Sequence, residues 1–465
     1  MIELSVGELG TLLRTRKVSP VEVVEACLGQ IEKLNSQVQA FLTVTGERAL
    51  AAARTAEEEI RRGRYKGPLH GIPYAPKDLL ATKGIRTTNG SRVTAEWVPE
   101  YESTVTARLQ AAGAILVGKL NLLEFAMGSG QRGLVAPARN PWSLAHSPSG
   151  SSSGSGAALA ARMVPLTIGT DTGGSIRGPA KSCGVVGLKP TYGRVSRYGV
   201  TALSWTLDHV GPMARTVADV AAMLQVMGGA DPRDRTAARR AVPDFAKTLG
   251  AGVKGLRIGV AEGYFFEKVE PEVERALRTA MGELEKLGAV RVVAKVENAA
   301  ICSPALGVIL GAESATVHAE RLRDSAGLMA PLVRERLEAN SLYSAMDYIQ
   351  ALRVRTVMME EMRRVFAGCD AVLLPAGNPA PLLETEIVQT DLPPAVPAAP
   401  RPDTFNLANL TGIPSLVLPC GFTAGTPALP IGMQLCAKPF GEATLFRIGH
   451  AYQGVTDWHR RAPKF

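Results

Sequence analysis

The stretch GTDTGGSIR occupies Gly169–Arg177, and the stretch CGVVGLKPT follows at Cys183–Thr191. Two consecutive glycines ahead of Ser175 allow a tight turn and the close approach of a substrate carbonyl. Consecutive backbone N–H groups ahead of a serine can hold the oxyanion that forms during acyl transfer. We therefore expect Ser175 to lie at an acyl-transfer site.

A phosphate-binding loop is the first alternative for this glycine-rich stretch. That motif requires the spacing GxxxxGK[ST], in which a lysine follows the last glycine. Here Ser175 follows Gly173 and Gly174 directly, so the pattern is absent. A nucleotide site is therefore less well supported than acyl transfer.

A second block, Ser147–Gly156, consists almost entirely of serine and glycine. Such a composition is typical of a flexible linker between domains. Here, however, the block runs directly into helix-forming residues at 157–163 and a strand-like run at 164–169. Small residues at the entrance of a helix let backbone N–H groups face a ligand. We therefore expect a packed functional loop instead of a linker.

A nucleophilic serine needs a base, and histidine is the usual one. No GxSxG elbow surrounds Ser175, and His70, His209 and His450 lie in apolar or glycine-containing contexts that favour structural roles. The remaining candidate is Lys77, at the end of the apolar run GIPYAPK. Desolvation of a lysine there would lower its pKa from about 10.4, so that a neutral amine becomes available.

Farther from these motifs, helical patterns alternate with short apolar runs, which argues for an α/β sheet. Ser19 followed by Pro20 predicts the start of a helix. Further helices are expected at 46–62, from Ser103, from Pro271 and at 344–366. Strands are expected at 72–75, 114–117, 256–260, 371–374, 416–419 and 431–435. The proline-rich segment 375–402 is expected to be a long loop, and such loops are often functional.

The 465 residues carry a formal net charge of +9. Because the basic residues are scattered among acidic ones, we read this charge as a solvated surface, and nucleic acid is not expected as a partner. None of the six cysteines forms a CxxC pair, so reduced and mostly buried thiols are expected. No signal peptide and no apolar run long enough to span a bilayer is evident, which predicts a soluble cytoplasmic protein.

Together, these motifs resemble the amidase signature family. The resemblance runs over most of the chain and is densest from Gly67 to Met213. It implies one domain over residues 1–465, built on a large central mixed β-sheet with helices on both faces. Residues 67–213 would then form the catalytic core, and residues 231–403 a variable region that shapes the substrate pocket.

The resemblance also implies catalytic roles. In that family a lysine, a serine in cis-peptide linkage and a nucleophilic serine relay protons, and these positions fall on Lys77, Ser151 and Ser175. The oxyanion hole maps to the backbone of Thr172, Gly173 and Gly174, together with that of the nucleophile. An amide would then be cleaved through an acyl-enzyme that water hydrolyses.

Supporting roles follow from the same resemblance. Residues expected to brace the nucleophile loop are Ser152, Thr170, Asp171 and Arg177. Residues expected to line the pocket are Met127, Gly128 and Ser129. No metal and no cofactor are expected, the partner is a small amide, and a homodimer is allowed.

The chain departs from the family pattern in the serine block. The usual Gly-Gly-Ser-Ser-Gly-Gly-Ser has Ser149 in place of its first glycine and Ser153 in place of a later one. If either position needs a positive φ, a serine there is strained. The residue after Arg177 is Gly178, a position that varies in the family.

The main functional prediction is a stand-alone amidase, and two alternatives remain open. The first is the glutaminase subunit of the tRNA-dependent amidotransferase, whose motif resembles Asn409–Gly412. The aspartate that reads the glutamine amine in that protein has no clean match, since Asp403 is one residue out of register. The stretch Ser204–His209 also looks more like stand-alone amidases. The second alternative is a catalytically impaired binding protein of the same fold.

Overall fold

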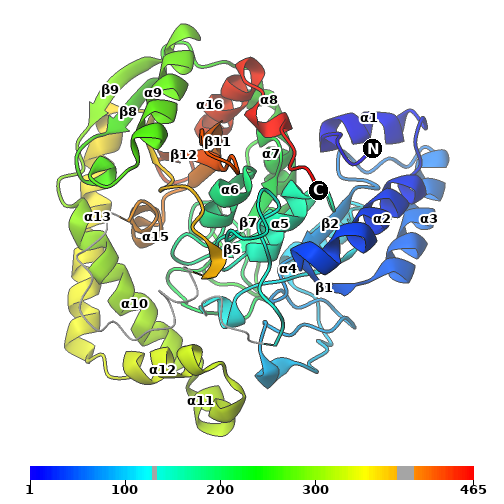
Figure 1. The fold of residues 1–465 in the computed structure, drawn as a ribbon, viewed down its shortest axis with the longest axis horizontal. Coiled ribbons are helices and arrows are strands. Elements are labelled where there is room, and N and C mark those ends of the chain that lie inside the picture. Colours follow the sequence, from blue (N-terminus) through cyan, green and yellow to red (C-terminus); the bar gives the residue numbers. More distant parts are fainter. Residues whose placement is uncertain (128–133, 385–402) are drawn as a thin grey trace.

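The computed structural model describes residues 1–127, 134–384 and 403–465. In these residues ten strands form one sheet, in the order β3-β2-β5-β7-β6-β11-β12-β10-β8-β9 (Figure 1). The strands are β2 (Pro73–Pro76), β3 (Ile115–Leu116), β5 (Leu166–Asp171), β6 (Val186–Lys189), β7 (His209–Ala214), β8 (Arg257–Ala261), β9 (Val290–Ala294), β10 (Ala371–Pro375), β11 (Ser415–Phe422) and β12 (Pro430–Ala437). Two further strands, β1 (Phe41–Val44) and β4 (Gly118–Leu120), pair separately.

The sheet is mixed, as the family resemblance implied. The strand β2 runs parallel to β3 and β5, and β8 runs parallel to β9 and β10. The central pairs, from β5 through β7, β6, β11 and β12 to β10, are antiparallel. Every residue of β6 and β12 is buried, because helices cover both faces of the sheet.

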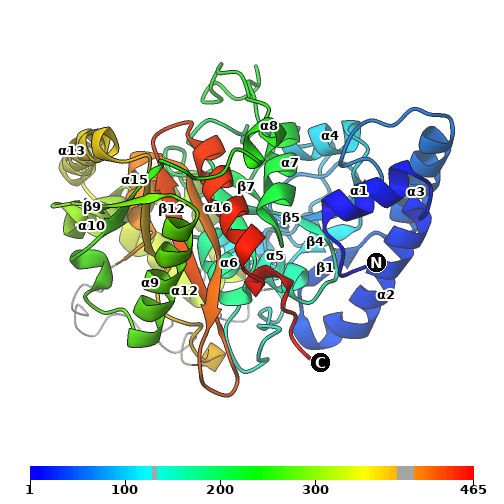
Figure 2. The ribbon, with the colours of Figure 1, turned by 90° about the horizontal axis from the view of Figure 1, so that it is seen from above.

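Side chains of β11 show the two faces. Leu416 and Leu418 enter one core, while Val417 enters the other. Helices that cover the first face are α4 (Thr104–Ala111), α7 (Val217–Met227), α9 (Pro271–Lys286) and α16 (Glu442–Val455). Helices that cover the second face are α5 (Ser153–Ala160), α6 (Arg177–Cys183), α10 (Cys302–Val317), α13 (Ala345–Gly368) and α15 (Asn406–Thr411). Figure 2 shows α16 lying along the sheet.

The two ends of the molecule are helical. The helices α1 (Val6–Arg14), α2 (Pro20–Val38) and α3 (Gly46–Arg61) lie at one end of Figure 1, with α11 (Ala319–Ser325) and α12 (Pro331–Asn340) at the other. The helix α2 begins as expected: Ser19 caps it and Glu22 closes a capping box. A short helix, α8 (Ala246–Leu249), packs on α16.

The serine-glycine block is packed, not flexible. The helix α5 begins inside it at Ser153, four residues before the expected 157. Close contacts explain why only small residues fit: a Cβ on Gly154 would lie 2.5 Å from the Ala40 carbonyl oxygen, and one on Gly156 would lie 2.9 Å from that of Pro179. The expected loop is therefore partly the first turns of a helix.

One segment differs from the expectation that no stretch could span a bilayer. Ala299–Val317 is long and apolar enough to do so, judged by length and composition alone. In the structure its residues Leu306 and Ile309 pack against α13 and α15 in a buried cluster. The segment therefore serves here as a core helix.

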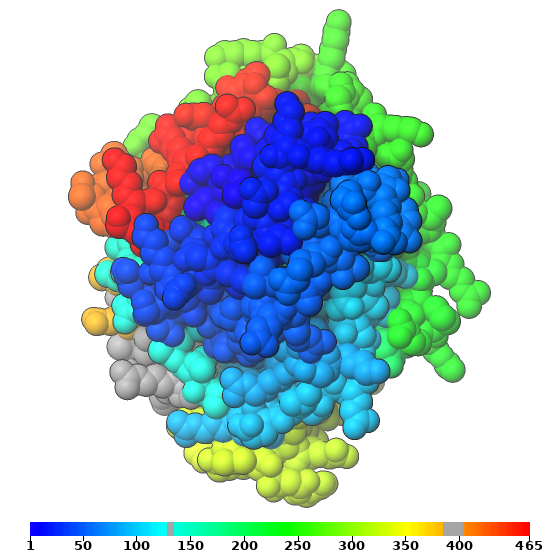
Figure 3. All heavy atoms as spheres, turned by 90° about the vertical axis from the view of Figure 1, so that its right-hand side faces the viewer, coloured from blue at the N-terminus to red at the C-terminus, as the bar shows by residue number. Residues whose placement is uncertain are grey.

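The two chain ends meet on one surface (Figure 3). Arg162 joins them, because its guanidinium donates to the Glu3 carboxylate at 2.9 Å and to the Arg461 carbonyl at 2.9 Å. Arg215 holds the N-terminal segment further by donating to the carbonyl of Ile2 at 2.8 Å. All six cysteines are free and buried, as expected.

Candidate active site

Lys77 follows β2 directly and is completely buried. Its Nζ donates to Ser151 Oγ at 2.7 Å and to Thr170 Oγ1 at 2.9 Å. Burial lowers the pKa of Lys77 to about 7, although the negative charges of Asp171 and Asp208 oppose that shift. A large fraction of this amine is thus neutral near neutral pH, with a lone pair able to accept a proton from the Ser151 hydroxyl.

Ser151 lies between the lysine and the nucleophile loop. The peptide bond between Gly150 and Ser151 is cis. The next residue ties the two loops together, since Ser152 N–H donates to the Ser175 carbonyl at 3.2 Å. The Ser152 hydroxyl bonds both the carbonyl and the amide of Thr170, each at 3.2 Å. Ser152 and Thr170 thus brace the loop as expected.

Ser175 lies in the turn between β5 and α6 and is partly exposed. Gly174 has φ of +111°, and a Cβ there would lie 2.7 Å from the Phe405 ring. Only glycine suits that position. The Ser175 hydroxyl makes no hydrogen bond to any described residue, so the link from Ser151 to Ser175 remains a prediction.

The amides of this turn divide into two groups. Gly174 N–H donates to Asp171 Oδ1 at 2.8 Å, so it points into the protein. Within the part of the chain that the structure describes, nothing accepts a bond from the amides of Thr172, Gly173 or Ser175. Of the predicted oxyanion donors, Thr172 and Gly173 thus keep free N–H groups, as does Ser175, while Gly174 supplies the turn.

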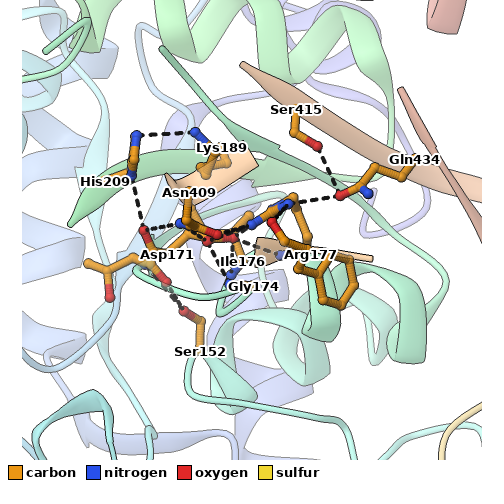
Figure 4. A network of polar contacts seen from close by, with 12 residues as sticks. Ser152, Asp171, Gly174, Ile176, Arg177, Lys189, His209, Asn409, Ser415 and Gln434 are labelled. Atoms are coloured by element: carbon orange, nitrogen blue, oxygen red, sulfur yellow. Dashed lines mark hydrogen bonds and ion pairs between the residues drawn. The ribbon is translucent and has the colours of Figure 1, made fainter. Parts of the chain in front are cut away.

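A buried ion pair holds the turn from below. Arg177 contacts the Asp171 carboxylate through Nε and Nη2, each at 3.0 Å (Figure 4). Burial alone would raise the pKa of Asp171, but Arg177 and Lys189 hold it far below its usual value. Arg177 also donates to Gln434 Oε1 at 2.8 Å and to Asn409 Oδ1. The carboxylate is therefore charged and fixed from several sides.

The predicted pocket residues are only partly described. Gly128 and Ser129 lie outside the described residues. Met127 is buried in an apolar cluster with Phe125, Leu203 and Val333, which makes it a core side chain. Its predicted place in a pocket wall therefore lacks support.

Other residues approach the glycine turn that the sequence did not single out. A Cβ on Gly173 would lie 3.5 Å from Asn406 Oδ1 and 3.7 Å from Leu306, and Gly174 faces Phe405. Asn406 in turn donates to Ser303 Oγ at 2.9 Å. These residues come from α10 and the start of α15, far along the chain, and the only sequence signal near them was the Asn409–Gly412 motif.

Two acidic residues lie close to the site. Asp208 accepts a bond from Thr172 Oγ1 at 2.6 Å, beside a cavity of about 270 Å³ that Thr170 and Thr172 also line. Asp403 Oδ1 accepts from the amides of Phe405 at 2.7 Å and Asn406 at 2.9 Å. Asp403 thus caps the segment that enters α15.

Comparison with known proteins agrees over nearly the whole chain. The family model described as Amidase matches residues 22–446. The type-A subunit of the glutamyl-tRNA(Gln) amidotransferase of Chloroflexus aggregans is 43% identical, and the match covers 99% of this chain and 98% of that protein.

Two solved structures extend the comparison. The peptide amidase of Stenotrophomonas maltophilia superposes with a TM-score of 0.88 at 29% identity, covering 99% of this chain and 98% of its own. The corresponding glutamyl-tRNA(Gln) amidotransferase chain of Thermotoga maritima gives 0.79 at 31% identity, covering 98% and 96%.

Proposed function

Since the chain belongs to the amidase family, we propose that it hydrolyses a carboxamide C–N bond through an acyl-enzyme on Ser175. The observation that carries this proposal is the 2.7 Å contact between the buried Lys77 amine and Ser151 Oγ, beside a serine that follows two glycines. Lys77 accepts a proton by way of Ser151 while Ser175 attacks the amide carbonyl. The free amides of Thr172, Gly173 and Ser175 stabilise the oxyanion.

The proton then returns to the leaving amine, and water releases the acyl group as a carboxylate. The relay suits amides because an amine is a poor leaving group unless it is protonated. The experiment is labelling with a fluorophosphonate, in which Ser175 Oγ displaces fluoride from phosphorus. The wild-type chain should be labelled and the S175A variant should not. A folded wild-type protein that stays unlabelled would support a non-catalytic binding role instead.

For the substrate, we propose the side-chain amide of glutamine, with the chain acting as the glutaminase component of a tRNA-dependent amidotransferase. The support is 43% identity over 99% of the chain with a protein named for that enzyme. This proposal makes tRNA-bound partner subunits the consumers of the released ammonia. It predicts that glutamine hydrolysis by the purified chain alone is slow and rises when the other components of such an enzyme are added.

A stand-alone amidase is the second candidate, favoured by the position of Asp403. Its carboxylate already caps two amides of its own segment, and burial raises its pKa, which suits it poorly to bind a free ammonium group. This candidate predicts ammonia release from simple amides without partners. Assaying the purified chain on glutamine and a panel of small amides separates the two. A cytoplasmic location stays a prediction under either.

A further inference from the structure

A second buried lysine lies close to the nucleophile loop but outside the proposed relay. Lys189, the last residue of β6, and His209, the first of β7, are 0% and 3% exposed. Lys189 Nζ lies 3.1 Å from His209 Nε2, and it also donates to the Pro190 carbonyl at 3.0 Å. Figure 4 shows this pair beside Asp171.

The contacts of the imidazole determine its tautomer. His209 Nδ1 lies 2.7 Å from the carbonyl oxygen of Leu207 and 3.2 Å from that of Asp171. Because carbonyl oxygens only accept, Nδ1 carries the hydrogen. Nε2 then presents its lone pair to the Lys189 N–H. Burial, and next the neighbouring Lys189, lower the pKa of His209 well below 6.5, so the ring is neutral.

The Asp171 carbonyl has a particular place in the oxyanion turn. It shares one planar peptide unit with the Thr172 N–H, and in a trans peptide the two groups point in opposite directions. Asp171 is also the last residue of β5, so the strand ladder ends there and side chains must hold the next peptide. Asn409 Nδ2, at 3.3 Å, is the other side-chain donor near this carbonyl.

We propose that His209 is a positioning residue: its Nδ1–H bond to the Asp171 carbonyl fixes the peptide plane that aims the Thr172 N–H at the oxyanion. Lys189 supports this role by occupying Nε2, which keeps the ring in one orientation. The inference rests on the proposed acyl transfer at Ser175, and it gives a function to a histidine whose sequence context suggested only a structural one.

Two matched substitutions separate the two ring nitrogens. H209N places an amide N–H near the position of Nδ1 and removes the acceptor for Lys189. H209Q places an amide oxygen near the position of Nε2 and removes the donor to Asp171. Both bury one carboxamide, so thermal unfolding should show similar losses of stability in the two variants.

The measurement is the saturation kinetics of fluorophosphonate labelling, which give a limiting rate and a half-saturating concentration. H209N should keep the limiting rate within about 3-fold of wild type, because the donor to Asp171 is retained. H209Q should lower it on the order of 10- to 100-fold, less than outright loss of an oxyanion donor. Its half-saturating concentration should hardly change, since the oxyanion contact strengthens only in the transition state.

The outcomes are distinct. Equal rates in H209N and H209Q, whether both fast or both slow, would overturn the positioning role, as would a loss in H209Q that appears only in half-saturation. A wild-type chain that is not labelled at all would instead refute the proposed function. The pattern of a fast H209N and a slow H209Q supports the inference.

Discussion

At position 77 a primary amine is fully buried, with two hydroxyl groups as its side-chain partners. An ammonium ion there would lose its hydration without a carboxylate in direct contact. The neutral form is therefore favoured, and this preference is what makes a lysine usable as a base near neutral pH.

The pKa of about 7 for Lys77 predicts the pH dependence of acylation. Below that pH the ammonium form dominates and cannot accept a proton, so the labelling rate should fall about tenfold per pH unit, with a plateau above it. Labelling stopped at fixed times, from about pH 5.5 to about pH 8.5, measures this. Since the pKa of Lys189 is also lowered to about 7, the K189M variant is the control. It should keep the same acid limb, and loss of the limb in K189M would assign it to the wrong lysine.

Removing the amine should be more severe than shifting the pH. We expect K77M to slow labelling of Ser175 on the order of 10²- to 10⁴-fold, the usual contribution of a general base. The matched control is K83M, because Lys83 is an exposed lysine on the same loop. An unchanged rate in K77M, in protein that unfolds at the wild-type temperature, would mean that another group takes the proton.

The strain expected from the serine substitutions occurs at one position of two. Ser149 has φ of +62°, whereas Ser153 is helical. A left-handed serine costs about 1–2 kcal/mol relative to glycine. Its hydroxyl lies over Gly178, where an added Cβ would come within 2.7 Å of Ser149 Oγ. The glycine at the variable position 178 thus makes room for the serine.

This complementarity predicts a coupling between the two positions. G178A alone should destabilise the fold by about 1–3 kcal/mol through overpacking. In the S149G background the same change should cost at least about 1 kcal/mol less, because the clashing hydroxyl is gone. Urea unfolding of the four proteins closes the cycle. Additive effects would show that the two side chains do not share this space.

At the scale of elements, the segment from β5 to α6 depends on charges that are sealed from water. R177M should cost about 3–5 kcal/mol in free energy of unfolding, because it leaves the Asp171 carboxylate buried without its main partner. R363M is the control, since Arg363 is 72% exposed and paired within its own helix. Denaturant titrations compare the two. A loss below about 1 kcal/mol in R177M would mean that Lys189 alone suffices to hold the carboxylate.

Elements with local signals could be predicted from sequence, and those without could not. The starts of α2, α4 and α9 follow from Ser19, Ser103 and Pro271, whose caps or fixed φ act within one turn. The strand β7 was missed, because Gly211 and Pro212 are unusual in a central strand. The reason lies in a neighbouring strand: a Cβ on Gly211 would lie 2.0 Å from the Leu188 carbonyl.

The candidate site divides in the same way. Lys77, Ser151 and Ser175 lie in motifs whose spacing is visible in the sequence. The residues over the glycine turn, Leu306 and Phe405, come close only through packing of α10 and the segment before α15 on the sheet. No local pattern reports such a contact. Gly174 was assigned as an oxyanion donor because sequence shows its place in the turn, not the direction of its N–H.

At the scale of the whole molecule, the mixed sheet and its two helical layers agree with the family resemblance. The comparisons shift the substrate question toward the amidotransferase component, which the sequence alone left as the alternative. The reason is one of range: the catalytic motifs are common to the family, whereas the residues that select a substrate lie in its variable segments. A stand-alone enzyme and an amidotransferase component thus share one site and differ outside it.

The bridge that Arg162 makes between residue 3 and residue 461 has a consequence for how the chain can be cut. Ends that one guanidinium can touch can be fused by a few glycines, and new ends opened in an exposed turn such as the one at Gly425. Such a circular permutant should fold and label with fluorophosphonate at a rate near that of the parent. A permutant that fails to fold would show that the order in which the strands emerge matters as much as their final neighbours.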